Sequence, residues 1–229
     1  MEKRPLALQN RIPEPEIMDD FEQVQAYAQA DFRVPHEMFV DLLEERHGSD
    51  LKGLFLDLGC GPCDVTARFA KRFPDTTIHA VDASKPMLQE AERILEQRGL
   101  SQRITLFHAR LPFKDTPIFK NHYDGVIVNS LLHHLPSQKL LWDTISQCVR
   151  EGGIIFVMDL IRPHNTAEAK AIVEKYSGSE PEILKRDFYH SLLAAYRIPE
   201  IREYLKKTQL NHLTIEKVSD RHLIVWGKK

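Results

Sequence analysis

The stretch that most constrains the fold of this chain is residues 54–69, which read LFLDLGCGPCDVTARF. A short apolar run ends at Asp57, a Gly-Cys-Gly turn follows, and Val65 and Phe69 then recur at helical spacing. This pattern predicts a strand, a tight turn and a helix. Because glycine lets the backbone approach a ligand closely and the first N–H groups of a helix point at it, we expect a ligand to bind here.

Over the next hundred residues, short apolar runs alternate with helical patterns. The expected strands are residues 54–57, 77–82, 103–107, 124–129 and 154–159, and the expected helices are 64–73, 84–98 and 137–149. Gly99 and the Gly152-Gly153 pair follow the second and third helices as stop signals. The alternation predicts an α/β fold, a parallel sheet covered by helices on both faces.

The N-terminal region has a different pattern. Residues 1–16 are polar and interrupted by prolines, so we expect an extended arm. Apolar residues recur at helical spacing over 18–47, where Pro35 is expected to separate two helices. The chain therefore begins with a helical arm.

Beyond the fifth expected strand, residues 165–208 read as helices only, with breaks at Gly178, Pro181 and Pro199. Residues 212–218 and 222–226 are expected to form an antiparallel hairpin, because only a short polar turn separates them. The arm and the helical insertion could both lie over the carboxyl ends of the strands, where open α/β sheets bind ligands. We expect one domain, made of an arm or lid (1–50), a core (51–160), an insertion (161–209) and a closing hairpin (210–229).

Composition excludes several classes of protein. The 229 residues are 42% hydrophobic and 28% charged, as in an ordinary globular protein, and the net charge of −2 gives no general attraction to nucleic acid. No apolar run approaches the roughly 18 residues that span a bilayer, and residues 1–16 do not read as a secretory signal. Three cysteines do not make a disulfide framework, so we expect a cytoplasmic protein without membrane partners.

The glycine turn fits poorly with a nicotinamide dinucleotide site. That fingerprint needs a third glycine for close helix–strand packing, and Asp64 stands at the corresponding position. A carboxylate at the start of the helix would also repel a pyrophosphate.

The same turn contains the tetrapeptide Cys60-Gly61-Pro62-Cys63, which is similar to the redox motif of thioredoxins. A helix N-terminus would lower the pKa of these thiols. However, Gly59 replaces the aromatic residue that precedes that motif, and the chain is much longer than that fold needs. The alternative is that both cysteines are small residues tolerated in a crowded turn.

A third interpretation uses two acids. Asp57 ends the first expected strand and Asp82 ends the second. An ionised carboxylate has two acceptor oxygens, so Asp82 can accept both hydroxyls of a ribose. Asp57 can organise the turn and face a cationic amino group. The pair indicates a nucleoside that carries an amino-acid tail.

At this point the sequence resembles the class I S-adenosylmethionine-dependent methyltransferases. The resemblance begins with Asp57-Leu-Gly59-Cys-Gly61 and Asp82, runs from about residue 53 to 160 and returns in the closing hairpin. Further matches are Ala83 to Leu88, Tyr123 to Val126, Asn129 to Leu135 and Arg150 to Gly153. It implies a Rossmann-like, mostly parallel seven-stranded sheet that ends in an antiparallel hairpin.

The resemblance also implies roles for particular residues. The residues placed against S-adenosyl-L-methionine are Asp57, Gly59, Cys60, Gly61, Asp82, Ala83, Met87, Ala109, Arg110, Asn129 and Leu131. Among them, Asp82 would bind the ribose, Ala83 and Met87 would flank the adenine, and Ala109 or Arg110 would meet its edge. Two features depart from the family: Cys63 replaces a common glycine, and no acid follows the third expected strand.

Methyl transfer needs alignment of the acceptor more than it needs covalent catalysis, and a base only where the acceptor loses a proton. The candidate catalytic residues are His133, His134, Tyr27 and Asp159. The histidines have no metal-ligand spacing with a nearby acid, and neighbouring positions place His133 and His134 on different sides of a helix. We therefore expect no catalytic metal.

Together these observations predict an S-adenosylmethionine-dependent methyltransferase that acts on a small-molecule acceptor by in-line displacement. Two alternatives stay open. One is a tRNA or rRNA methyltransferase, for which Lys185-Arg186 and Lys206-Lys207 offer local positive charge. The other is a non-catalytic sensor or partner protein that keeps the cofactor fold.

Overall fold

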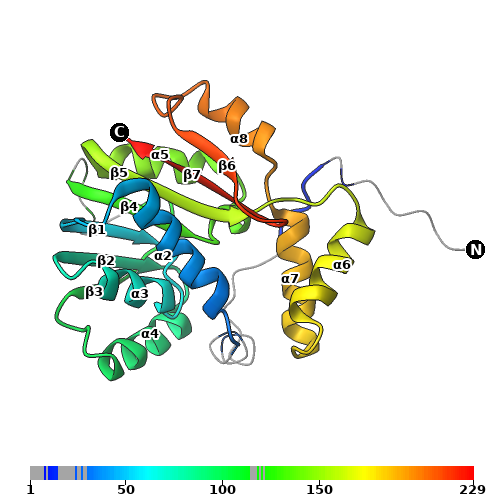
Figure 1. The fold of residues 1–229 in the computed structure, drawn as a ribbon, viewed down its shortest axis with the longest axis horizontal. Helices are drawn as coiled ribbons and strands as arrows, with labels where there is room; N and C mark the ends of the chain where they lie inside the picture. Colours follow the sequence, from blue (N-terminus) through cyan, green and yellow to red (C-terminus); the bar gives the residue numbers. More distant parts are fainter. Residues whose placement is uncertain are drawn as a thin grey trace, which may run out of the picture.

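A seven-stranded sheet in the order β3-β2-β1-β4-β5-β7-β6 forms the centre of the protein (Figure 1). The strands are β1 (Gly53–Leu58), β2 (Thr76–Asp82), β3 (Ile104–His108), β4 (Tyr123–Asn129), β5 (Val149–Leu160), β6 (Thr214–Lys217) and β7 (His222–Lys228). The first five strands pair in parallel, and β7 is antiparallel to both β5 and β6. The predicted mostly parallel sheet and closing hairpin are confirmed.

This computed structural model describes residues 8, 10–14, 24, 27, 30–113, 118, 120 and 122–229. Most of the helix expected before Pro35 lies outside these residues. Residues 11–14 form neither helix nor strand, as expected of an extended arm. Among the residues described, no helix combines the length and the apolarity that crossing a membrane requires.

Helices cover both faces of the sheet. The helices of the described residues are α2 (Arg33–His47), α3 (Asp64–Arg72), α4 (Lys85–Gln97), α5 (Gln138–Cys148), α6 (Thr166–Ser177), α7 (Glu182–Ala194) and α8 (Ile198–Leu205), with a short 3-10 helix η1 (Leu132–His134). Helices α2, α3 and α4 share one core cluster with the sheet, and α5 and α8 share a second cluster on the other face. Helices α6 and α7 form a third cluster beyond the sheet (Figure 1).

Alternation along the strands explains the two main cores. On β1, Phe55 belongs to the cluster of α2, α3 and α4, whereas Leu56 and Leu58 belong to the cluster of α5 and α8. Successive side chains of a strand point to opposite faces, so a continuous apolar run is what a strand covered on both sides requires.

Two expected boundaries are wrong. Helix α2 begins at Arg33, so Pro35 lies in its first turn, where the missing N–H has no intrahelical partner to lose. Helix α5 ends at Cys148, and β5 begins at the next residue, so Gly152-Gly153 lies inside a strand and does not stop the helix. The register of β4 and β5 shifts between Tyr123 and Gly125, opposite this glycine pair. Gly99, with a φ of 66°, follows the end of α4 as expected.

Residues 8 and 10–14, the described part of the extended arm and called the N-terminal segment below, lie against the C-terminal half of the chain. The N–H of Leu8 donates to the carbonyl of His164 at 3.0 Å, and the N–H of Ile12 donates to Leu193 at 3.1 Å. Leu8 is also part of the core shared by α6 and α7. This segment is therefore positioned beside the insertion.

The core around α3 provides a test of this packing. Phe69 is fully buried and lies between Phe55 and Phe73, with ring centroids 5.0 and 4.9 Å away. We expect Phe69→Ala to lower the free energy of unfolding by about 3–5 kcal/mol through lost burial and a new cavity. Urea unfolding measures this loss.

Val34→Ala is the control, because Val34 is 73% exposed and should change stability by less than about 0.5 kcal/mol. Equal stability of the two variants would contradict the packing of α3.

Candidate functional site

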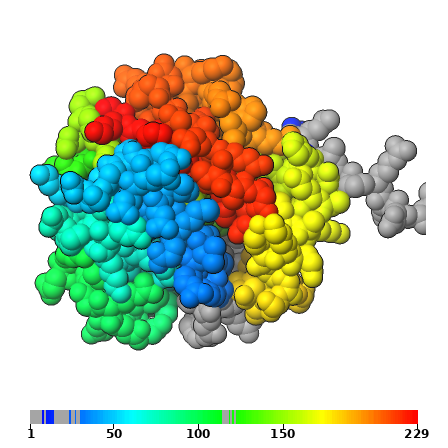
Figure 2. All heavy atoms as spheres, in the orientation of Figure 1, coloured from blue at the N-terminus to red at the C-terminus, as the bar shows by residue number. Residues whose placement is uncertain are grey.

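A cavity of about 800 Å³ lies at the carboxyl ends of β1, β2 and β4. All the residues that the sequence placed against a cofactor line it: Asp57, Gly59, Cys60, Gly61, Asp82, Ala83, Met87, Ala109, Arg110, Asn129 and Leu131. Its volume is within the range of small-molecule sites. In Figure 2, α2 and the insertion helices α6 and α7 are neighbouring parts of the visible surface, and residues of all three line the cavity.

Asp82 connects two backbone turns at the cavity wall. Its Oδ2 accepts the N–H of Gly61 at 2.8 Å, and its Oδ1 accepts the N–H of Ser84 at 2.8 Å. Burial raises the pKa of Asp82, and these N–H groups partly offset that effect. One carboxylate thus holds the turn after β1 beside the start of α4.

At Gly59 and Gly61 no side chain separates the backbone of the turn from the cavity. A Cβ at Gly59 would lie 2.8 Å from Leu131 Cδ1, whereas a Cβ at Gly61 would meet nothing within 4 Å. Both glycines have positive φ, at 72° and 51°. Cys63 also has a positive φ of 64°, so it adopts the conformation that the family's glycine would take more easily.

Asp57 is buried at the base of the turn. Thr66 Oγ1 donates to Asp57 Oδ2 at 2.5 Å. Burial raises the pKa of Asp57 to about 7, with the Thr66 hydrogen bond opposing and the charge of Asp82 reinforcing the shift. The carboxyl group therefore titrates near neutral pH and can gain a negative charge when a cation approaches.

Asn129, at the end of β4, has a buried side-chain oxygen with no partner among the described residues. Asn129 lines the cavity. Because buried polar atoms are nearly always hydrogen-bonded, an acceptor left free at a cavity wall suits a ligand that donates.

The turn does not have the properties of a redox centre. Cys60 and Cys63 are both buried and free. Burial raises the pKa of the Cys60 thiol well above its usual value, and the nearby Cys63, Asp82 and Asp57 raise it further. A redox pair needs a thiolate that is easily formed. This finding favours the interpretation of these cysteines as packing residues.

Two of the predicted catalytic residues form a pair. His133 Nδ1 lies 2.6 Å from Asp159 Oδ1, and Asp159 Oδ2 accepts the N–H of Leu132 at 2.7 Å. Burial alone would lower the pKa of His133, but the charge and the hydrogen bond of Asp159 raise it. His133 lines the cavity and Asp159 lies behind it. The second nitrogen of His133, Nε2, is left for a ligand or a proton.

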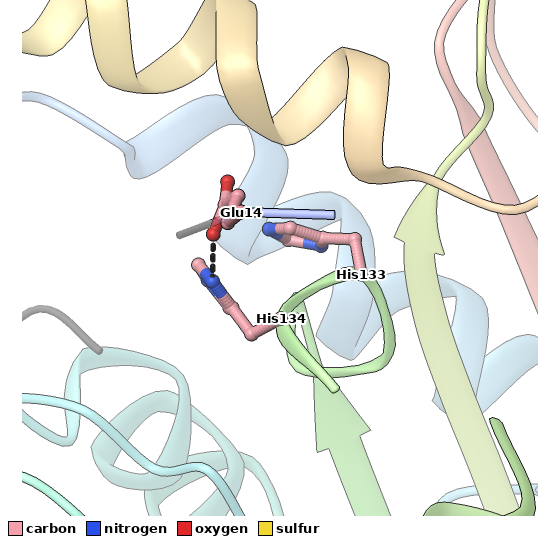
Figure 3. A group of neighbouring side chains, drawn as sticks. All are labelled: Glu14, His133 and His134. Atoms are coloured by element: carbon pink, nitrogen blue, oxygen red, sulfur yellow. Dashed lines mark ion pairs between the residues drawn. The ribbon is translucent and has the colours of Figure 1, made fainter. Parts of the chain in front are cut away.

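His134 lies beside His133, contrary to expectation. The two residues share the 3-10 helix η1, and their ring centroids are 4.1 Å apart (Figure 3). His134 Nδ1 forms an ion pair with the carboxylate of Glu14. The prediction that the two rings lie on different sides of a helix is wrong, because these residues follow the strand in a tight turn and not in an α-helix.

Tyr27, the fourth predicted catalytic residue, also lines the cavity. Its ring lies 4.7 Å from that of Phe32, measured between centroids. Burial raises the pKa of Tyr27 to about 12, and the charges of Asp82 and Asp64 add to this shift. The hydroxyl is therefore neutral at pH 7, and its proton is available for donation to a ligand.

Several lining residues were not predicted from sequence. They are Glu14 in the arm, and Glu180, Asp187, Ser191, Arg221 and His222 in or after the insertion. Tyr176 of α6 also lines the cavity. No local signal marks Glu14, which stands in a polar segment and reaches the cavity through tertiary packing alone.

Comparison with known proteins identifies the type of domain. Residues 56–155 match a family model described as a methyltransferase domain. An uncharacterized methyltransferase of Mycobacterium bovis is 31% identical over 108 residues, which cover 47% of this chain and 51% of the relative. A trans-aconitate 2-methyltransferase of Methylobacterium radiotolerans is 32% identical over 117 residues, covering 50% and 40%. The chain therefore matches about half the length, or less, of these curated relatives.

The fold as a whole is similar to that of a solved S-adenosylmethionine-dependent methyltransferase from Aquifex aeolicus. The TM-score is 0.64 at 14% sequence identity, and the alignment covers 90% of this chain and 97% of that one. The expected Rossmann-like fold is confirmed.

The buried carboxyl group of Asp57 predicts a pH dependence of stability. Its folded-state pKa of about 7 lies above the unfolded value of 3.8. Stability is therefore full below pH about 4 and falls as pH rises toward 7, because the unfolded state loses its proton first. Relative to Asp57→Asn, we expect the wild type to lose on the order of a few kcal/mol over this interval.

Urea unfolding at several pH values measures the difference between the two proteins. The amide introduced by Asp57→Asn would keep an oxygen that accepts from Thr66, so the comparison isolates the titration. A difference that stays constant from pH 4 to 8 would contradict the assignment.

Proposed function

We propose that this chain is a class I S-adenosylmethionine-dependent methyltransferase, which binds S-adenosylmethionine and transfers the methyl group to a small-molecule acceptor. The match of residues 56–155 to a methyltransferase domain and the similarity of the fold to a solved methyltransferase support this proposal. The main support for this proposal is the set of groups that line one cavity. Asp82, the bare turn at Gly61 and the free oxygen of Asn129 all line it.

These groups fit the cofactor. An ionised Asp82 can accept hydrogen bonds from two ribose hydroxyls while it keeps the N–H groups of Gly61 and Ser84, since each oxygen has two lone pairs. Asn129 Oδ1 can accept from the ammonium of the methionine portion. The open space at Gly61 leaves room for the ligand against backbone. Ala83 and Met87 supply an apolar surface for the adenine.

When bound, S-adenosylmethionine supplies a methyl group activated by a positively charged sulfur. The protein's task is then to align an acceptor with that methyl group and to exclude water. His133, held by Asp159, is the candidate group for receiving a proton if the acceptor must lose one. Tyr27 and His134 are candidates for orienting the acceptor from the same cavity.

Several features support a small acceptor. Residues of the arm, of α7 and of the segment before β7 line the cavity together with the strand ends, so the acceptor region has walls on several sides. The net charge of −2 provides no general attraction to RNA. A relative named as a trans-aconitate 2-methyltransferase is consistent with this class of acceptor.

The role of Asp82 can be tested by calorimetry with S-adenosylmethionine. Asp82→Ala removes an acceptor of two charge-assisted hydrogen bonds, each contributing about 1.5 kcal/mol, so we expect about 100-fold weaker binding. Asp75→Ala is the matched control, since Asp75 is exposed just before β2, at the opposite end of the strand. Absence of binding by the wild type would contradict the proposal.

The class of acceptor can be tested with a labelled methyl group. We expect label from S-adenosylmethionine to enter a small-molecule extract and not a tRNA pool. Label in tRNA alone would show that the proposed acceptor class is wrong. Cofactor binding without transfer to either pool would favour the sensor alternative.

A further inference from the structure

Three side chains that could bind a metal lie close together at the wall of the cavity. Glu14 comes from the N-terminal segment, and His133 and His134 come from η1 after β4 (Figure 3). Each offers one ligand atom, and these atoms lie within 4.8 Å of one another. All three residues line the same cavity as Asp82. The group is thus built from distant parts of the chain and opens toward the substrate region.

The donor set suits a particular class of ion. Two imidazole nitrogens and one carboxylate oxygen match the three protein ligands of catalytic zinc sites, which keep a fourth position open. Magnesium and calcium prefer oxygen ligands alone. With bonds of about 2.1 Å, tetrahedral ligands lie about 3.4 Å apart. The three ligand atoms lie within 4.8 Å of one another, so binding an ion requires them to approach by about 1.4 Å at most.

Asp159 provides an independent indication. Its Oδ1 lies 2.6 Å from His133 Nδ1, and the N–H groups of Leu132 and Leu160 both donate to its carboxylate at 2.7 Å. The pair is almost completely buried. A carboxylate that fixes one nitrogen of a histidine, and leaves the other as the ligand, is the usual arrangement behind a metal-binding histidine.

The N-terminal segment is held in place so that Glu14 reaches the histidines. Arg11 donates to the carbonyl of Leu135 at 2.7 Å and to the hydroxyl of Tyr196 at 3.0 Å, and it also donates to the carbonyls of His133 and Ala194. Ser191 of α7 donates to Glu14 Oε1 at 2.6 Å. These contacts fix Glu14 beside both rings, with Oε1 held by Ser191 and Oε2 paired with His134.

We propose that Glu14, His133 and His134 bind one divalent transition-metal ion of the zinc type, with the open position facing the cavity. The prediction of no metal relied on the lack of metal-ligand spacing with a nearby acid and on the separation of the two rings. In the structure the rings are adjacent, and the acid comes from a distant part of the sequence. The proposed metal site is argued from the positions of these three side chains alone and does not depend on the proposed function. Its consequence, that the metal binds the acceptor's heteroatom and that His133 is then a ligand instead of a free base, rests on the proposed function.

The test is a titration of the full chain, freed of metal with a chelator, with Zn²⁺ by calorimetry. We expect one Zn²⁺ per chain, and at least about 10-fold weaker binding in Glu14→Gln and in His134→Gln. Asp159→Asn should weaken binding by about 10–100-fold through loss of orientation. His164→Gln is the matched control, because His164 is an exposed histidine that is not part of the group.

Bound Co²⁺ gives a second readout, since its visible absorption reports the coordination geometry. Wild type should show bands that Glu14→Gln and His134→Gln lose. No Zn²⁺ binding by the wild type, or equal affinity in these variants and in His164→Gln, would overturn the proposal. Loss of binding only in a Cys60→Ser, Cys63→Ser double variant would also overturn it, because the ion would then belong to the glycine turn.

Titration of the wild type with S-adenosylmethionine separates the two proposals. A chain that binds the cofactor but no Zn²⁺ contradicts the metal site alone. A chain that binds Zn²⁺ but no cofactor supports the metal site and contradicts the proposed function.

Discussion

The carboxylate of Asp82 is the contact on which the candidate site depends. It ends β2 and accepts backbone N–H groups from the turn after β1 and from the start of α4. Charge-assisted hydrogen bonds of this kind are stronger than neutral ones. They hold the turn after β1 and the start of α4 side by side in the same wall of the cavity. The positive φ of Gly59 and Gly61 then becomes useful, because the turn can pass close to a ligand without side chains in the way.

The other side of the cavity depends on buried ionic and polar contacts. Arg162, fully buried, donates to the carbonyl of Ala195 at 2.8 Å and to Glu200 at 2.6 Å. Arg197 donates to the carbonyls of Leu8 and Pro163 at 2.9 and 3.0 Å. Through these residues the N-terminal segment, the segment after β5 and the start of α8 are connected. Pro13 and Glu14 of this segment are therefore part of the cavity wall.

Much of the fold follows from the sequence, for identifiable reasons. Strands buried on both faces read as continuous apolar runs, and the acids at the ends of β1 and β2 are local signals, so Asp57 and Asp82 could be found directly. Helix boundaries were harder to place. Pro35 is compatible with the first turn of α2, so a proline does not by itself mark a helix end.

The part of the cavity around His133, Asp159 and Glu14 could be predicted only in part. His133 lies in η1 just after β4, and Asp159 lies near the end of the neighbouring strand β5, so the sheet topology brings them close together. Glu14 carries no such signal, because its position depends on the contacts of Arg11 and Ser191. The predicted placement of the His133 and His134 rings on different sides of a helix is wrong, because spacing in the sequence cannot distinguish a 3-10 turn from an α-helix.

The central claim is that the cavity at the strand ends binds S-adenosylmethionine. Hydrogen–deuterium exchange with and without the cofactor tests it most directly, because exchange locates the bound surface along the chain. If the cofactor binds there, protection is expected in the turn after β1, in the segment from Asp82 to Met87 and in the segment from Asn129 to His134, while exchange in β6 stays unchanged. Unchanged exchange in these three segments at saturating cofactor, or protection confined to other parts of the chain, would contradict it.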